Sequence, residues 1–208
     1  MMAGIKRDKE MGEYFMRKVF LTTMSMQQPL TAYKYESVCY PDSLETANPI
    51  TISIENNCNS GDEILFLTIV SHGEYKNDAE INYSKYCDQV HKLLQDMDVK
   101  CEFVEIQVSA KLTPHSHRDL YKKIIGYLHD DDEIYADITY GFKYNSIVIF
   151  TALNYAYQSL NDVDIKEICY GNLYTGDKEL KPEYYDITSL FYMNSFISHA
   201  GQDFSDDI

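Results

Sequence analysis

Short apolar segments alternate along the chain with stretches in which apolar residues recur every three or four positions, and this alternation restricts the fold more than any other feature. The apolar segments are residues 19–23, 64–70, 100–108, 133–137 and 165–170. Short continuous apolar runs are typical of strands buried on both faces of a parallel sheet. The periodic stretches predict helices at about 79–98, 116–128, 142–159 and 188–199. We therefore expect an α/β fold, a Rossmann-like three-layer sandwich with a mainly parallel central sheet.

The segment from residue 24 to residue 60 has a weaker pattern. Prolines and a turn-like stretch at 56–61 interrupt it. Ile50, Ile52 and Ile54 alternate with polar residues, which predicts an edge strand at 50–54 after a loop or a β-excursion. In the helices that follow, Ser116 and either Thr188 or Ser189 are candidate N-caps.

Size and charge exclude several classes of protein. The 208 residues suit one domain at 18–208 after a polar lead-in at 1–17, and the net charge of −15 argues against binding of long nucleic acids. An apolar run of membrane-spanning length is absent, and the N-terminal stretch lacks the apolar core of a secretory signal. Five widely spread cysteines favour reduced thiols in a cytoplasm, and we expect neither a metal nor a cofactor.

Loops that follow the strands are the places to look for a site, because ligands of open parallel sheets bind beyond the carboxyl ends of the strands. These loops are residues 22–29, 71–75 and 137–145. None of them contains the glycine-rich dinucleotide fingerprint, the P-loop or the nucleophile elbow. A simple dehydrogenase, nucleotide triphosphatase or α/β-hydrolase is therefore not expected.

The stretch Asp137–Ser146, with the sequence DITYGFKYNS, leads directly into the apolar helix predicted at 142–159. Gly141 allows the backbone to approach a ligand, the first amides of the helix face an anion, and Lys143 adds a positive charge. The same residues have an ordinary interpretation, in which Asp137 and Thr139 cap the helix and Lys143 is solvated.

This stretch, together with the helix after it, resembles the D-[IL]-T-H-G-F-R-x-x-P signature of the CRISPR-associated Rossmann-fold (CARF) family. Further pieces match the family in order: KVFLTTMS, EILFLTIVSHGE, EICYGNL and YYDITSLFYM, so that the resemblance covers about residues 18–200. The chain departs from the signature at Tyr140, which replaces histidine, at Lys143, which replaces arginine, and at Ser146, which replaces proline. Lysine keeps the charge but loses the bidentate geometry of arginine.

The resemblance implies a sensor of cyclic oligoadenylate in type III CRISPR antiviral signalling, which would pass its signal to an effector domain or partner chain. A homodimer across helix 142–159 would build one two-fold site for the ring, although a helix buried within one domain explains the same apolar pattern. The residues implied as ligand-binding are Thr22, Thr23, Met24, Ser25, Ser71, His72, Gly73, Glu74, Thr139, Tyr140, Gly141, Phe142, Lys143 and Tyr170.

Two further functions stay open at this point. In a metal-independent ring nuclease, the ribose 2′-OH would attack its own 3′-phosphate and leave a 2′,3′-cyclic phosphate. Lys143 would then stabilise the phosphorane, and Thr23 or Ser25 would orient the 2′-OH. A flavodoxin-like protein that binds another nucleotide or FMN is the remaining alternative, because the expected fold permits it.

Overall fold

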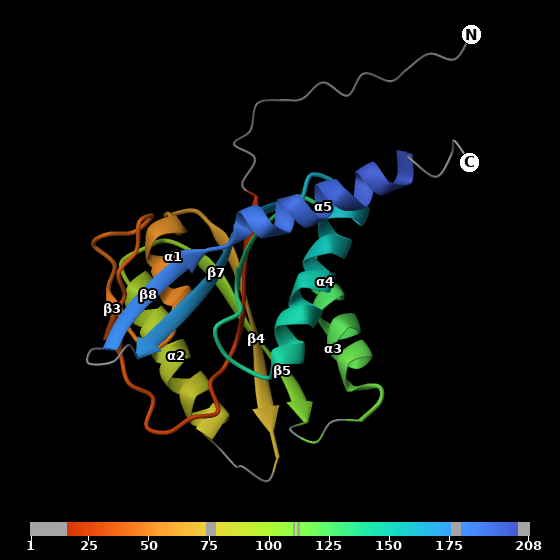
Figure 1. Cartoon of the computed structure of the whole chain (residues 1–208). Helices are drawn as coiled ribbons and strands as arrows, with labels where there is room; N and C mark the ends of the chain where they lie inside the picture. Colours follow the sequence, from red (N-terminus) through yellow and green to blue (C-terminus); the bar gives the residue numbers. More distant parts are fainter. Residues whose placement is uncertain (1–15, 74–77, 110, 112, 176–179, 204–208) are drawn as a thin grey trace.

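The expected α/β fold is confirmed by a computed structural model, which describes residues 16–73, 78–109, 111, 113–175 and 180–203 (Figure 1). Within that part of the chain, the sheet strands are β1 (Arg17–Thr23), β4 (Glu63–His72), β5 (Lys100–Ser109), β6 (Asp132–Asp137), β7 (Asp164–Thr175) and β8 (Leu180–Asp186). The helices are α1 (Ile50–Asn57), α2 (Asp78–Leu94), α3 (Ser116–Ile125), α4 (Lys143–Ser159) and α5 (Thr188–Asp203). A separate ribbon pairs β2 (Tyr33–Lys34) with β3 (Glu45–Thr46).

Helices cover both faces of the sheet and make a three-layer sandwich. On one face α3, α4 and α5 pack on strand residues such as Leu21, Leu67 and Ile134. On the other face α1, α2 and the segment 24–49 pack on residues such as Phe20 and Phe66. Neighbouring residues of a strand thus enter different cores, which is why the central strands β1 and β4 are buried over most of their length and largely apolar at their centres.

The strand order β5-β4-β1-β6-β7-β8 is the 3-2-1-4-5-6 order of a classic Rossmann sheet when the six sheet strands alone are numbered. Every neighbouring pair is parallel except β7 and β8, which are antiparallel. The chain leaves β1 toward α1 on one face of the sheet, and it leaves β6 toward α4 on the opposite face. The carboxyl ends of β1 and β6 therefore flank a topological switch point, where folds of this kind hold their ligands.

The strand predicted at 50–54 is wrong, because residues 50–57 form helix α1. The alternation of Ile50, Ile52 and Ile54 suggested one buried and one exposed face, yet Thr51 and Ser53 between them are buried as well. The Thr51 hydroxyl donates to the Asn48 carbonyl oxygen at 2.8 Å, which satisfies one of these polar groups inside the fold. Residues 50–54 are all buried and only the end of α1, at Glu55 and Asn56, is exposed, so the buried part of the helix carries no amphipathic period.

Three further details differ from the sequence-based prediction. Helix α2 ends at Leu94 instead of near Asp98. Ser116 is the first residue of α3, and its hydroxyl accepts from the Thr113 amide instead of capping the helix. At the start of α5, the Asp186 carboxylate accepts from the Thr188 amide at 2.9 Å, so the capping acceptor is the aspartate.

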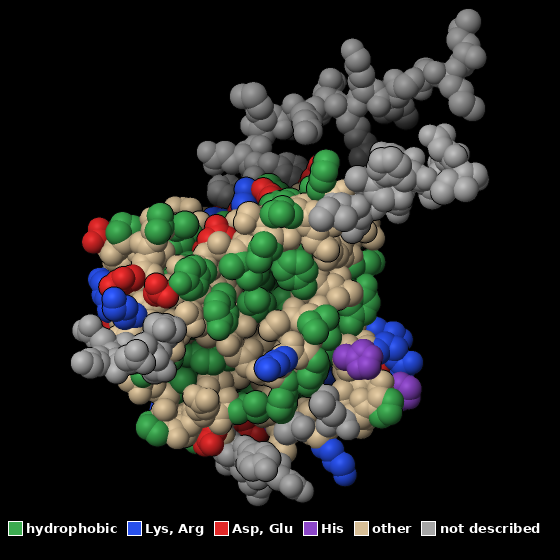
Figure 2. Space-filling model, in the orientation of Figure 1, with side chains coloured by type: hydrophobic (Ala, Val, Ile, Leu, Met, Phe, Trp, Pro, Cys, Tyr) green, Lys and Arg blue, Asp and Glu red, His purple; other side chains and the backbone are tan. Residues whose placement is uncertain are grey.

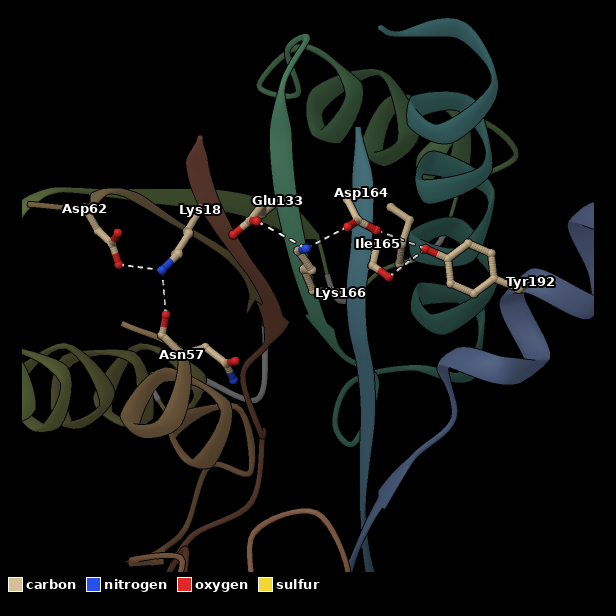
Figure 3. A network of polar contacts seen from close by, with 8 residues as sticks. All are labelled: Lys18, Asn57, Asp62, Glu133, Asp164, Ile165, Lys166 and Tyr192. Carbon is tan, nitrogen blue, oxygen red and sulfur yellow. Dashed lines mark hydrogen bonds and ion pairs between the residues drawn. The ribbon is translucent and has the colours of Figure 1, made fainter. Parts of the chain in front are cut away.

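Polar contacts at the amino ends of the strands tie the layers together, far from the switch point (Figure 3). The buried Lys18 ammonium donates to Asp62 at 2.6 Å and to the Asn57 carbonyl at 2.7 Å. Lys166 contacts Glu133 at 3.2 Å and Asp164 at 2.7 Å. Among the described residues, no helix is long and apolar enough to span a membrane.

Candidate functional site

A hydrogen-bonded cluster joins the carboxyl ends of β1 and β6. The Thr22 hydroxyl donates to Oδ2 of Asp137 at 3.2 Å, and the Thr139 amide donates to Oδ1 at 2.7 Å. Both Thr22 and Asp137 are buried. The acid that ends β6 therefore joins the two central strands and turns the chain toward α4.

Burial raises the pKa of the Asp137 carboxyl above its usual range, and hydrogen bonds from Thr139, Thr22 and the Ile50 amide only partly offset this effect. Desolvation penalises the charged form, whereas donors to the carboxylate favour it. An acid in this position acts as an acceptor inside the scaffold instead of facing a ligand.

Hydrogen bonds hold the loop 138–142 to two neighbouring parts of the fold, strand β7 and the segment 24–49. The Ile138 amide donates to the Cys169 carbonyl at 3.1 Å, and the Gly171 amide donates to the Thr139 hydroxyl at 2.8 Å. On the other side, the Tyr140 hydroxyl donates to the Ala47 carbonyl at 2.8 Å. Tyr140, where the CARF signature has a histidine, thus anchors the segment 24–49 over this end of the sheet.

Gly141 is the point of closest approach between this loop and β1. Its φ of +91° lies in the region that L-residues rarely adopt, and a Cβ there would lie 2.4 Å from Cγ2 of Thr23 and 2.8 Å from Nδ2 of Asn145. Only glycine fits without a shift. The backbone before α4 is therefore exposed on one side and held tightly against β1 on the other.

The N-terminus of α4 opens beside Gly141. Its N-cap residue, Phe142, makes no capping side-chain hydrogen bond, and its first turn carries no acidic residue. The first amides of a helix have no partner within the helix and form the positive end of its dipole. Lys143 is the first helical residue, and its side chain is exposed. This end of α4 is electrostatically suited to an anion.

Two buried polar side chains lie unpartnered beneath this helix end. Within the part of the chain that the structure describes, both side-chain atoms of Asn145 and the hydroxyl of Thr23 have no hydrogen-bond partner. Asn145 is fully buried, and Thr23 is 1% exposed. A buried amide or hydroxyl without a partner costs about 1–3 kcal/mol. Both groups are buried, so they lie beneath the surface, and the helix N-terminus above them is the part of this region that is open to solvent.

The residues implied by the resemblance fall into classes of different exposure. Thr22, Thr23, Met24, Ser25 and Ser71 are buried. His72, Thr139, Tyr140 and Phe142 are half-buried, and Gly73, Gly141, Lys143 and Tyr170 are exposed. Glu74 lies outside the described residues. The carboxyl ends of β1 and β6 bring together Thr22, Thr23, Thr139, Gly141 and Lys143.

Ser25 and His72 are already engaged in contacts within the protein. The Ser25 hydroxyl accepts from the Gln27 amide at 3.1 Å, and the Ser25 carbonyl accepts from Asn82 of α2 at 2.8 Å. His72 places Nδ1 at 2.7 Å from Glu80 and Nε2 at 2.7 Å from Glu105. Two carboxylates beside this ring make it a poor contact for a phosphate.

Asn145 and Ala47 belong to the site and were not among the predicted site residues. Asn145 lies within the stretch 137–146 that carries the resemblance. It is a polar residue at a buried position of the helix, and this position in the sequence pattern could have indicated its place in the site. Ala47 contributes only its backbone carbonyl, from a loop that is distant in the sequence. Because any residue has such a carbonyl, the sequence could not predict this contact.

Comparison with family models and with curated proteins finds no match for this chain. The fold defines a Rossmann-like α/β protein with a helix N-terminus open at its switch point. A more specific assignment rests on the motif at 137–146 and on the geometry around it.

Proposed function

We propose that this protein binds a cyclic oligoadenylate at the N-terminus of α4, beyond the carboxyl ends of β1 and β6, and acts as a sensor of the CARF type. The observation that carries the proposal is the uncapped N-terminus of α4, with Lys143 exposed and the unpartnered Asn145 and Thr23 beneath it. The resemblance at 137–146 supplies the identity of the ligand, since it implies a cyclic adenylate.

A phosphate at this position gains from three local features. The α4 amides donate to it, Lys143 offsets its charge, and Gly141 lets the backbone come close. Local donors matter here because the whole chain carries a net charge of −15 and repels polyanions at longer range. Binding must therefore be concentrated at this helix end.

The geometry favours sensing over cleavage of the ring. Thr23 and Ser25, the hydroxyls expected to orient a ribose 2′-OH, are 1% and 2% exposed. Lys143 then remains as the accessible charged group of the predicted catalytic set. Charge stabilisation by one lysine supports binding, whereas in-line attack also needs groups that align the nucleophile.

A homodimer is part of the proposal, through an apolar surface on α4 and α5. The α4–α5 face comprises the exposed side chains of Ile147, Tyr157, Leu190, Met193 and Phe196. Figure 2 shows hydrophobic side chains gathered across this side of the molecule. Exposed apolar patches of this kind mark interaction sites. A two-fold axis through this face would bring two α4 helices together, so that each copy serves half of a symmetric ring.

Light scattering tests the dimer. The wild type is expected at twice 24.2 kDa, and replacing Ile147 and Phe196 by aspartate should give a folded monomer, because charges would have to be buried in the interface. A wild type that stays monomeric at micromolar concentration would contradict this part of the proposal.

The five cysteines are free thiols, and two of them, Cys58 and Cys169, are buried. Unpaired cysteines are typical of proteins that work in reducing compartments. This supports a cytoplasmic location, where a nucleotide second messenger would be met.

Calorimetric titration with cyclic tetra-adenylate and cyclic hexa-adenylate tests the ligand. Each charge-assisted contact contributes about 1.5–3 kcal/mol, so that loss of two Lys143 side chains in a dimer should weaken binding about a hundredfold or more. Lys143→Arg should keep most of the affinity. Lys92→Ala, on the exposed surface of α2 in the opposite layer, serves as the matched control and should bind like the wild type.

Two results would overturn the proposal: a Lys143→Ala variant that binds as tightly as the wild type, or a wild type that binds neither ring. Mass analysis of the ring after incubation separates sensing from cleavage. An intact ring fits the proposed sensor, and accumulation of linear products with 2′,3′-cyclic phosphate ends would assign a ring nuclease instead.

A further inference from the structure

Positive charge is concentrated on one part of this acidic chain. Residues 111–123 contain four of the 18 lysines and arginines, two histidines and a single acidic residue, Asp119. Arg118, Lys122 and Lys123 lie exposed on α3. In Figure 2, lysine, arginine and histidine side chains gather at the lower right, where Figure 1 places α3. In a protein of net charge −15, such a cluster forms a local site for anions.

A groove of about 290 Å³ lies beside this cluster, between α3 and α4. It is lined by His117, Arg118, Tyr121, Tyr144, Ile147, Val148 and Thr151. Its walls are thus aromatic and aliphatic, while its rim is cationic. The volume is at the lower end of the range of small-molecule sites, which suits one nucleotide and not a folded domain.

The two tyrosines of the groove are held in place by neighbouring rings. Tyr144 stacks on Phe142 with the ring centroids 5.6 Å apart and the planes at 11°. Tyr121 meets Tyr155 edge to face, with the centroids 6.3 Å apart. Rings fixed in this way lose little entropy when a base stacks on them. Aromatic side chains next to cations are the recurring surface for single-stranded nucleic acid.

Arg118 is available to a phosphate. Its closest ion pair is with the adjacent Asp119, at 3.6 Å, and both side chains are more than half exposed. Exposed pairs of this kind contribute little and are readily exchanged for another partner. Lys123, by contrast, donates to the Gln107 carbonyl at 2.8 Å and helps to hold α3 on the sheet.

We propose that the α3–α4 groove binds one nucleotide of a short single-stranded oligonucleotide, with the base stacked on Tyr144 and Tyr121 and the phosphate on Arg118 and Lys122. A duplex does not fit this description, because its bases are already stacked within the helix. The acidic remainder of the surface repels a longer strand, so affinity should stop rising after the first few nucleotides. Thr23, Gly141 and Lys143 are not among the residues that line this groove. Ile147 lines the groove and also belongs to the α4–α5 face, whereas Leu190, Met193 and Phe196 of that face lie on α5.

Fluorescence anisotropy with a labelled tetra-adenylate RNA tests the proposal. Arg118→Ala and Tyr144→Leu should each weaken binding about tenfold, in line with the worth of a stacked base or a charged contact. Arg118→Lys should recover part of the loss, and the matched control Lys92→Ala should leave binding within twofold. Thermal unfolding of each variant shows whether it is folded.

Three comparisons sharpen the test. An unlabelled duplex or a poly-glutamate of equal charge should compete poorly, whereas a dodeca-adenylate should bind within a few-fold of the tetra-adenylate. Adenosine monophosphate separates a free nucleotide from a strand: if it competes as well as the tetra-adenylate, a mononucleotide is the occupant and the strand is ruled out. Arg118→Ala should bind cyclic tetra-adenylate like the wild type, which distinguishes this groove from the proposed site at the N-terminus of α4. The proposal is overturned if folded Arg118→Ala and Tyr144→Leu variants bind like the wild type, or if poly-glutamate competes equally.

Discussion

Replacing Gly141 by alanine tests the close packing of the loop before α4 against β1 most directly. The new Cβ would lie 2.4 Å from Cγ2 of Thr23, whereas carbon atoms in contact prefer about 3.5–4.0 Å. Thr23 is 1% exposed on the central strand β1 and has little room to move. The φ of +91° adds a second strain, because L-residues avoid positive φ.

The expected loss of stability follows from these two terms. A left-handed conformation costs an L-residue about 1–2 kcal/mol, and an overpacked contact costs about 1–3 kcal/mol. Alanine regains about 0.4–1 kcal/mol by restricting the unfolded chain. The variant should therefore lose about 2–4 kcal/mol. For a chain of 208 residues this lowers the Tm by about 5–15 °C.

Calorimetric or fluorescence-detected thermal unfolding measures the change. Gly126→Ala is the matched control, because Gly126 at the end of α3 has a φ of −68° and should change stability by less than about 1 kcal/mol. Thr23→Ser removes the methyl group in the way, so the double variant should recover about 1–3 kcal/mol of the loss. A Gly141→Ala protein with the Tm of the wild type would refute the close approach of this loop to β1.

Two further perturbations test the scaffold around the site. Asp62→Ala leaves the buried Lys18 without its carboxylate and should lower the free energy of unfolding in urea by about 3 kcal/mol. Lys166→Ala removes a more exposed ion pair and should lower it by less than about 1 kcal/mol. Equal losses of stability in the two variants would contradict the difference in burial. Burial raises the pKa of Glu167, so the folded protein holds that proton more tightly than the unfolded chain, and stability should fall as the pH rises through the raised pKa. Glu167→Gln should reduce this fall in Tm as the pH rises above about 4.5, and an unchanged slope would count against the raised pKa.

The strands of the parallel sheet could be predicted because burial on both faces leaves a local signature. Ile64–Val70 is apolar at every position except Thr68, and the structure buries all of it. The antiparallel strand β8 was not predicted, since the sequence LKPEYYD is polar and contains a proline. Edge strands are solvated along one side, so their sequences carry a weaker pattern.

For the candidate site, the sequence by itself determined that an acid, a glycine and a lysine follow β6 and precede an apolar helix, because these residues are neighbours in the chain. Only the tertiary structure decided that Gly141 lies against Thr23, that Tyr140 reaches the Ala47 carbonyl, and that Asn145 has no partner among the described residues. It also decided that the isoleucines at 50–54 form a helix. These contacts join segments far apart in the sequence, and the register of strands and the packing of layers that create them depend on the whole chain at once.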